Sequence, residues 1–210
     1  MKDYEKLSQA YYNKIADRFD YSMDGLFSYP FKKLITHELA INSGERVLDV
    51  GCANGRLLAF LNRKRIINGY GIDISEQFIE IARKNYPQFK FYQGSALKLP
   101  FPDDFFNVLI CSASFHHFPA PDVFLEEARR VLRKGGRLII AEINIPIFLN
   151  LYNQYIDKYN QEGDVKVYSV KELKSLLNQA GWQIIKKRIF FQVQYYELIS
   201  NGQSATMTSS

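Results

Sequence analysis

Between residues 46 and 143, short apolar segments alternate with segments whose apolar residues recur three or four positions apart. The short segments have the length of β-strands, and the spacing in the others is typical of amphipathic helices. Because parallel strands need crossover connections, this alternation predicts a doubly wound parallel sheet with helices on both faces. The segment 106–111 is apolar throughout, as expected for a strand covered on both sides. We therefore expect an α/β fold of the Rossmann-like class.

Capping and breaking residues bound the expected elements. A helix is expected at 56–61, directly after a glycine-rich turn. Ser75 is a good N-cap for the next helix, which Pro87 ends. A third helix is expected over Asp122–Leu132, with the glycine pair 135–136 as its terminator. The expected strands are 46–50, 70–74, 89–92, 106–111 and 137–143.

Two flanking regions complete the chain. Residues 3–42 have helical apolar spacing, and Ser169 caps an expected helix that stops at Gly181. Two β-rich segments then follow, 183–189 and 191–199. Residues 201–210 are rich in Ser, Thr and Gly, and we expect them to be disordered.

The overall charge is modest, at +5 from 27 Lys and Arg against 22 Asp and Glu. The basic residues are scattered, with the densest groups at 63–65 and 186–188, so a nucleic-acid partner is not favoured.

No apolar segment reaches the roughly 18 residues of a membrane span, and the polar N-terminus carries no signal-peptide pattern. Cys52 and Cys111 lack metal-ligand spacing, so neither a metal site nor a disulfide is predicted. We expect a cytoplasmic, reduced protein.

The segment 47–55, VLDVGCANG, is the strongest functional signal. A buried strand enters a turn with two glycines, and a helix begins directly after it. Such a turn lets the backbone approach a ligand closely, and the helix N-terminus favours a carboxylate or phosphate. A dinucleotide fingerprint would need glycine where this chain has Ala53 and Arg56, which argues against a nicotinamide oxidoreductase. Asp49, at the strand end, suits a ligand that carries an ammonium group.

Three later segments follow the next expected strands. Asp73 ends the second strand, where an acid can bind both hydroxyls of a ribose. Its alternative role is to cap the following helix, although Ser75 already serves there. The segment 94–101 should lie beside the base of the ligand, and 111–118 should face the reaction centre, because ligands bind outside the carboxyl ends of such strands.

Taken in order, VLDVGCANG, GIDIS, QGSALKLPFPDDFFNVLI and LRKGGRLII resemble the motifs of the class I S-adenosylmethionine-dependent methyltransferase superfamily, closest to its small-molecule branch. The resemblance covers residues 45–143 closely and the C-terminal helix and hairpin loosely. It implies one domain over 1–200, with a helical lid at 1–42, a cofactor-binding core at 45–143 and acceptor-side helices with a hairpin at 144–200. It also implies a seven-stranded sheet whose last strand is antiparallel.

The resemblance further implies S-adenosyl-L-methionine as cofactor and S-adenosyl-L-homocysteine as product. The turn after the first strand would surround the methionine moiety, Asp73 would hold the ribose, and an N-terminal tyrosine, Tyr12 or alternatively Tyr11, would cover the cofactor. The implied cofactor-binding residues are Tyr12, Asp49, Gly51, Cys52, Ala53, Gly55, Asp73, Ile74, Ser95, Ala96, Leu97 and Ser112.

Three positions depart from the family pattern. Ala53 stands where glycine is common, which costs little if its backbone angle is ordinary. Ser95 stands where an aspartate often contacts the adenine amino group, and the loss of the charged acceptor is expected to cost about 1 kcal/mol of cofactor binding or more. Asn107 stands where an aspartate is usual, and the sequence gives no functional reason for it.

Methyl transfer is an in-line displacement from a sulfonium with a good leaving group, so catalysis is expected to rest on positioning and desolvation. If the acceptor must lose a proton, His116 is the candidate base and His117 the alternative, although such a pair can also be purely structural. The aromatic segment 146–159 is expected either to form an acceptor wall or simply to pack on the sheet edge.

A small-molecule methyltransferase is therefore the leading functional prediction. A methyltransferase that acts on RNA or protein, and a non-catalytic homologue that binds the cofactor, are the alternatives. The sequence indicates neither the acceptor nor the oligomeric state.

Overall fold

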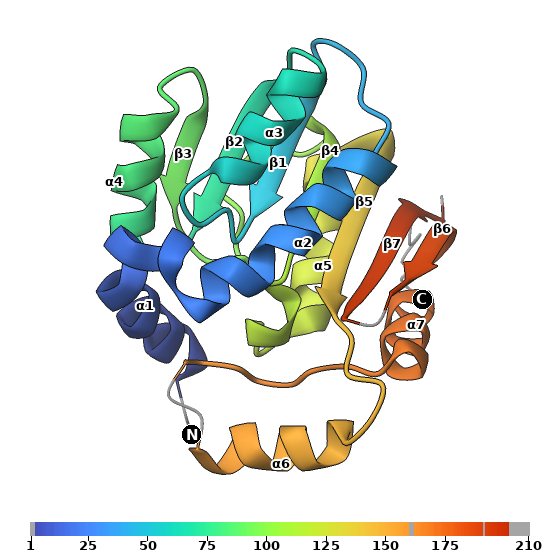
Figure 1. Cartoon of the computed structure of the whole chain (residues 1–210). Coiled ribbons are helices and arrows are strands. Elements are labelled where there is room, and N and C mark those ends of the chain that lie inside the picture. Colours follow the sequence, from blue (N-terminus) through green and yellow to red (C-terminus); the bar gives the residue numbers. More distant parts are fainter. Residues whose placement is uncertain (1–2, 160–161, 191, 202–210) are drawn as a thin grey trace, which may run out of the picture.

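The computed structural model describes residues 3–159, 162–190 and 192–201. Its centre is a seven-stranded sheet in the order β3-β2-β1-β4-β5-β7-β6 (Figure 1). The strands are β1 Arg46–Val50, β2 Asn68–Asp73, β3 Lys90–Gln93, β4 Phe106–Ser112, β5 Leu132–Ile143, β6 Trp182–Ile189 and β7 Val193–Ser200. Strands β1–β5 pair in parallel, whereas β7 is antiparallel to both of its neighbours. The predicted mixed sheet with an antiparallel last strand is confirmed.

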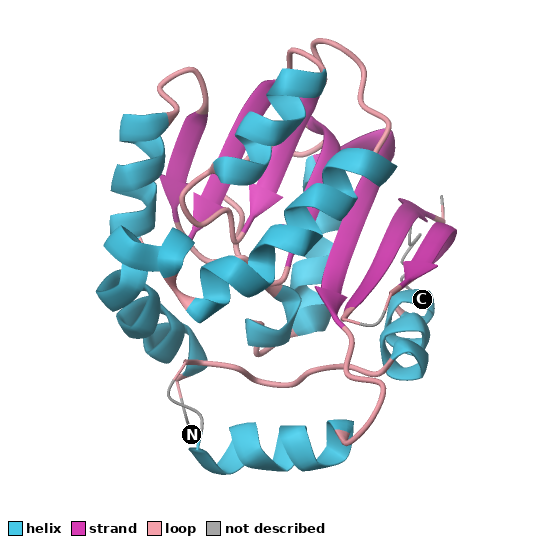
Figure 2. Ribbon diagram, viewed as in Figure 1, coloured by secondary structure: helices cyan, strands magenta, loops and turns pink. Residues whose placement is uncertain are grey.

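Helices cover both faces of the sheet (Figure 2). They are α1 Tyr4–Ile15, the 3-10 helix η1 Ala16–Tyr21, α2 Met23–Glu38, α3 Arg56–Lys64, α4 Glu76–Asn85, the 3-10 helix η2 Phe115–His117, α5 Pro121–Val131, α6 Leu149–Tyr159 and α7 Val170–Gln179. On one face α2 and α3 bury apolar residues such as Ile35 and Leu58, and on the other face α5 and α7 bury Leu125 and Leu173. The helical apolar spacing in the sequence is the cause, because it gives each helix one apolar stripe.

One junction differs from the prediction. The helix expected over Asp122–Leu132 ends at Val131, and β5 begins directly afterwards instead of at Arg137. The glycine pair 135–136 therefore lies within β5, at a shift in its register against β4. Gly135 has φ +74, an angle that glycine adopts readily in strand irregularities. The glycines shape this strand and do not terminate the helix.

The N-terminal helix α1 lies across the carboxyl ends of the strands (Figure 1). Glu5, Gln9 and Asn13 stand four positions apart, so they form one stripe on the helix. Each bonds to the loop after β2 or β3. The bonds are Ser95 Oγ to Glu5 Oε1 at 2.5 Å, Gln9 Nε2 to Ile74 O at 3.1 Å and Ser75 Oγ to Asn13 Oδ1 at 2.7 Å. Helix α1 is thus fixed to the loops that follow β2 and β3.

The segment between β5 and α7 is packed more loosely. Helix α6 stands apart from the sheet in Figure 1, and Ile156 is its one buried residue. The segment 162–168 then returns to the sheet, and two of its backbone N–H groups donate to the carbonyl of His116. Ser169 caps α7 as predicted, in a full capping box. The tail expected to be disordered, 201–210, lies outside the described residues apart from its first residue.

Candidate functional site

A cavity opens at the carboxyl ends of β1, β2 and β4, with walls from α1 and α2. Strand β1 lies between β2 and β4, so this is the point at which the strand order reverses and where such sheets bind ligands. The predicted residues that line the cavity are Tyr12, Asp49, Gly51, Cys52, Ala53, Asp73, Ile74, Ala96 and Ser112. The predicted residues outside its lining are Gly55, Ser95, Leu97 and His116.

The turn after β1 brings its backbone close to the cavity through left-handed angles. Gly51 has φ +73, and a Cβ there would lie 2.2 Å from Ser114 Oγ, so only glycine fits. Gly55 supports the turn from behind, where a Cβ would lie 2.7 Å from the Phe91 ring. Ala53 has φ +45, so the condition for a cheap replacement of glycine is not met, and the angle costs an alanine roughly 1–2 kcal/mol. The chain therefore tolerates strain at the cavity wall.

Asp73 holds this turn against the end of β2. Its Oδ2 accepts from the backbone N–H of Ala53 at 2.8 Å, and its Oδ1 accepts from the N–H of Ser75 at 2.9 Å. Burial raises the pKa of Asp73 to about 6, although these backbone N–H donors oppose the rise. Ser75 caps α4 as predicted, because its Oγ accepts from the N–H of Phe78. Each Asp73 oxygen keeps a lone pair for a further donor.

Asp49 and Lys32 are two buried ionisable residues at the cavity, and each influences the pKa of the other. Asp49 is 2% exposed and Lys32 is 8% exposed. Burial raises the pKa of Asp49 to about 7, with Lys32 opposing the rise, and burial lowers the pKa of Lys32 to about 8. The Asp49 Oδ1 and the Ser112 Oγ have no hydrogen-bond partner. Because unpaired buried polar atoms are costly and rare in folded proteins, these two atoms mark a place suited to a polar ligand.

Ser95 and Leu97 lie beside the cavity, and Glu5 occupies the wall in front of them. Ser95 Oγ donates to Glu5 Oε1 and accepts from the N–H of Leu97 at 3.0 Å. Glu5 lines the cavity, so α1 supplies a carboxylate close to the position where the family more often has an aspartate. A distant helix thus brings a carboxylate next to Ser95.

The two adjacent histidines face different surroundings. His116 is 6% exposed, and its Nδ1 lies 2.8 Å from Glu142 Oε1 on β5. Burial alone would lower the pKa of His116, but the Glu142 carboxylate raises it to about 9. His117 lines the cavity, and its Nε2 lies 3.0 Å from the hydroxyl of Tyr12. Burial lowers the pKa of His117, and the neighbouring His116 lowers it further.

Sequence reasoning missed Glu5 and Lys32 as cavity residues. They come from helices far from the turn motifs, so no local spacing linked them to the site. The spacing of Glu5 with Gln9 and Asn13 was the available signal, since one polar stripe on an otherwise mixed helix indicates a docked face. Asn107 has a structural role, because its Oδ1 accepts a hydrogen bond of 3.0 Å from the backbone N–H of Arg46 at the start of β1.

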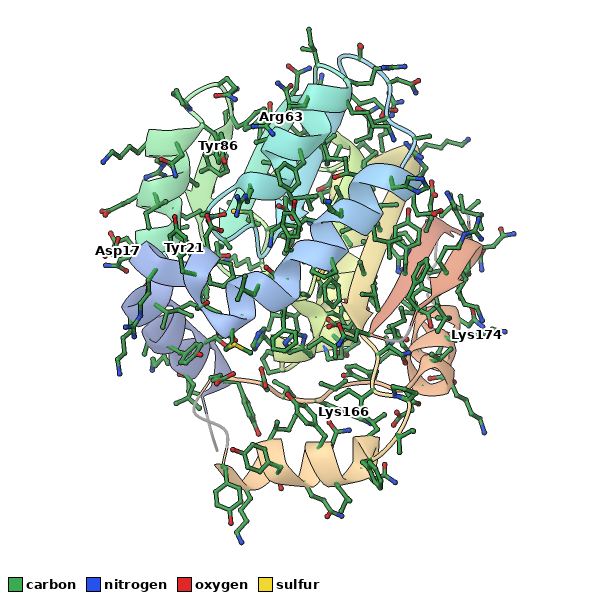
Figure 3. The ribbon with its side chains drawn as sticks, in the orientation of Figure 1. Asp17, Tyr21, Arg63, Tyr86, Lys166 and Lys174 are labelled. Carbon is green, nitrogen blue, oxygen red and sulfur yellow. The ribbon has the colours of Figure 1, made fainter. Side chains whose placement is uncertain are left out.

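The labelled basic side chains Arg63, Lys166 and Lys174 come from α3, the segment 162–168 and α7 (Figure 3). None of the helices among residues 3–159 and 162–201 combines the length and apolar character that crossing a membrane requires.

Comparison with known proteins identifies the family. A family model for a methyltransferase domain matches residues 48–140. The 27-O-demethylrifamycin SV methyltransferase of Amycolatopsis mediterranei is 32% identical over 68% of this chain and 56% of its own length. The chain spans between 37% and 65% of the length of the first four curated relatives that it matches.

Two solved structures are also similar. A putative methyltransferase from Bacillus halodurans C-125 has a TM-score of 0.68 at 27% identity, over 76% of this chain and 71% of its own. A chain from the complex between the Haloferax volcanii Trm112 methyltransferase activator and a putative methyltransferase has a TM-score of 0.81 at 18% identity, over 94% and 99% of the two chains, which indicates a shared fold. With the matching motifs and the mixed seven-stranded sheet, these similarities show that the chain belongs to the class I S-adenosylmethionine-dependent methyltransferase superfamily.

Proposed function

We propose that the cavity binds S-adenosyl-L-methionine and that the chain transfers its methyl group to a small-molecule acceptor. The observation that carries the proposal is the order of polar groups along the sheet edge. From β4 through β1 and β2 to β3, the strand ends present Ser112, Asp49, Asp73 and then Ser95 with Glu5. Adjacent strands lie roughly 4.8 Å apart, so these groups span about 14 Å. An extended nucleoside with an amino-acid chain needs such a row of partners.

Each part of that cofactor has a partner of matching chemistry. Asp49 and Ser112 offer unpaired oxygens to its ammonium group, and Lys32 offers a cation to its carboxylate. Asp73 accepts from the ribose hydroxyls, and Glu5 replaces the usual aspartate beside the adenine amino group. The remaining predicted residues shape or flank the site, with Gly51, Cys52, Ala53 and Gly55 in the turn and Ile74, Ala96, Leu97 and Tyr12 around the ligand.

We place the reacting atom of the acceptor next to His117 and not next to His116. Of the two histidines, His117 lines the cavity, whereas His116 lies outside its lining with its Nδ1 on the Glu142 carboxylate. When bound, the cofactor supplies an electrophilic methyl group on a sulfonium. The chain orients it with the Asp49 and Lys32 charges and excludes water with Tyr12 and Phe19, which line the cavity as well.

A small acceptor is favoured by the form of the site. The cavity is covered by α1, which bonds to the loops after β2 and β3, so a bulky macromolecule has little access to its floor. None of residues 146–159 lines this cavity, so the aromatic segment expected as an acceptor wall does not form part of it. The scattered basic residues argue against a nucleic acid.

The test is ligand-dependent thermal unfolding of the full chain, with S-adenosyl-L-homocysteine as ligand and NAD as control. At about 100 times its dissociation constant a ligand adds roughly 2.7 kcal/mol, which should raise the midpoint by about 5–10 °C. A shift with S-adenosyl-L-homocysteine alone supports the proposal and leads to a screen of small acceptors for turnover. A shift with NAD alone, or with neither ligand, would overturn the assignment of the cavity.

A further inference from the structure

A second cluster of ligating side chains adjoins the cavity. His116 and His117 lie in η2, directly after β4, and Asp164 lies in the segment that precedes α7. Asp164 Oδ1 is 3.0 Å from His117 Nδ1 and 3.7 Å from His116 Nε2. One ligand atom from each residue falls within 4.8 Å of the others. The sequence predicted no metal site, because 164 is far from the histidine pair and no local motif joins them.

One ring nitrogen of each imidazole already has a partner outside the cluster. The His116 Nδ1 lies 2.8 Å from the Glu142 carboxylate, and the His117 Nε2 lies 3.0 Å from the Tyr12 hydroxyl. The other ring nitrogens, His116 Nε2 and His117 Nδ1, are the ones that approach the Asp164 carboxylate. The His117 Nδ1 is close to the carboxylate without a hydrogen bond of acceptable geometry. A metal-binding histidine commonly has this arrangement, with one nitrogen on the ion and the other on a carboxylate or hydroxyl.

Distances and charge also fit a small divalent ion. With metal–ligand bonds of about 2.0–2.2 Å, ligand atoms in a tetrahedral site lie roughly 3.3–3.6 Å apart, which falls between the two separations at Asp164. Glu142 is 0% exposed and Asp164 is 8% exposed. A divalent cation would balance these two buried carboxylates while both imidazoles stay neutral.

We propose that His116, His117 and Asp164 bind one divalent transition-metal ion, with zinc as the best fit. Two imidazole nitrogens and one carboxylate oxygen suit zinc and its neighbours, whereas magnesium and calcium prefer sets of oxygen ligands. The ion ties the segment 162–168 to the end of β4, where two backbone N–H groups already bond to the His116 carbonyl. Its remaining coordination position takes water or an oxygen of another molecule. This site goes beyond the proposed function, because it assigns a bound ion to residues that the cofactor proposal does not use, apart from His117 and the hydroxyl of Tyr12, which also line the cavity.

The experiment uses the full chain, stripped with a chelator and then titrated with Co²⁺, whose visible absorption reports tetrahedral nitrogen and oxygen ligands. We expect one equivalent to bind and to be displaced by Zn²⁺. Asp164→Asn should weaken Co²⁺ binding at least tenfold, and His117→Gln should do the same. The matched control is His37→Ala, which removes the third histidine of the chain, one whose side chain is 83% exposed, and should leave binding unchanged.

Circular dichroism of each variant shows whether it is folded, so a misfolded variant is set aside and the other carries the test. Absence of Co²⁺ binding by the wild-type chain overturns the proposal. Binding that Asp164→Asn and His117→Gln leave intact overturns it too, and would show that the three residues form only an ion-pair cluster. Binding of S-adenosyl-L-homocysteine to the stripped chain is measured in parallel, so failure of the metal site is distinguished from failure of the proposed function.

Discussion

The proposed cofactor side and the acceptor side that the sequence predicts are built in different ways. On the cofactor side, the turn after β1 and the end of β2 are buried, and their polar groups are fixed by short hydrogen bonds such as Ala53 N to Asp73 at 2.8 Å. On the acceptor side, α6 buries Ile156 alone. The large apolar residues exposed in and before α6 are Ile147, Phe148, Leu151, Tyr152, Tyr155 and Tyr159.

This difference indicates which part of the chain can vary without loss of the fold. The turn after β1 needs particular residues, because a Cβ at Gly51 would collide with Ser114. Helix α6 imposes few such demands, since local stability follows the amount of buried apolar contact. We infer that one chain can keep a constant cofactor site while its acceptor surface changes, and the predictions below test that division.

The largest expected effect compares one core substitution on each side. Leu58→Ala, in α3, removes a side chain that is 0% exposed and should cost about 2–5 kcal/mol of unfolding free energy. Ile156→Ala should cost less than about 1 kcal/mol globally, because α6 can detach without unfolding the sheet. Urea unfolding measures both costs, and hydrogen exchange should show that the second variant loses protection only around 147–159. Equal losses of unfolding free energy in Leu58→Ala and Ile156→Ala would contradict the inferred difference between the two sides.

The next effect is on cofactor binding. Asp49→Asn keeps the shape of the side chain but removes the charge that faces the ammonium group. We expect it to weaken S-adenosyl-L-homocysteine about 10- to 100-fold, equivalent to roughly 1.5–3 kcal/mol, measured by calorimetry. Asp17→Asn is the matched control, because Asp17 is exposed and lies at the periphery in Figure 3. If Asp49→Asn binds S-adenosyl-L-homocysteine with unchanged affinity, Asp49 is not the partner of the ammonium group.

The pH dependence of the same residue gives an independent check. Burial raises the pKa of Asp49 to about 7 in the ligand-free chain, above its ordinary value of 3.8. The folded chain thus holds this proton more tightly than the unfolded chain, so the contribution to stability is present below pH 3.8 and is lost as the pH rises through about 7. Cofactor affinity should change in the opposite direction and fall as the pH drops below about 7, because protonation removes the charge. Both dependences should be smaller in Asp49→Asn, with a residual one near pH 6 from Asp73.

Sequence reasoning succeeded where residues close in sequence determine the structure. The periodicity of 46–143 predicted the strands and crossover helices, and Ser75 and Ser169 were correctly identified as caps. It failed at the glycine pair 135–136, because a glycine after a helix and a glycine in an irregular strand give the same local signal. It left the backbone angle at Ala53 open, because the side-chain pattern does not determine whether φ is positive there.

The residues that sequence reasoning missed in the site share one property. Glu5 and Lys32 reach the cavity from helices that pack over the sheet, so only the tertiary structure brings them to Ser95 and Asp49. Which of two adjacent histidines faces the cavity was equally inaccessible, because it depends on the partner that β5 offers to His116. Residues close together in the sequence determine the turn after β1, whereas the contacts of α1 join residues that are far apart in the sequence.

A smaller effect is expected at the adenine end of the cavity. Glu5→Ala removes the carboxylate that stands in for an acid at position 95 and should weaken S-adenosyl-L-homocysteine about tenfold, or roughly 1.4 kcal/mol. Glu80→Ala, on the exposed surface of α4, is the control. An analogue with hypoxanthine in place of adenine sharpens the test, because it lacks the amino group. Glu5→Ala should bind the two ligands more equally than the wild type does, and an undiminished preference for adenine would assign that contact to another residue.

The smallest expected effect is a gain in stability at the strained alanine of the turn. The left-handed φ of +45 costs Ala53 roughly 1–2 kcal/mol, whereas glycine adds about 0.5–1 kcal/mol of unfolded-chain entropy. Ala53→Gly should therefore stabilise the ligand-free chain by about 0.5–1 kcal/mol and raise its midpoint by about 1–4 °C. The same substitution on a right-handed backbone, Ala59→Gly in α3, should destabilise the chain by about 1 kcal/mol. If Ala53→Gly and Ala59→Gly destabilise the chain by the same amount, the backbone at Ala53 is not strained. Hydrogen bonds alone would then fix the turn after β1.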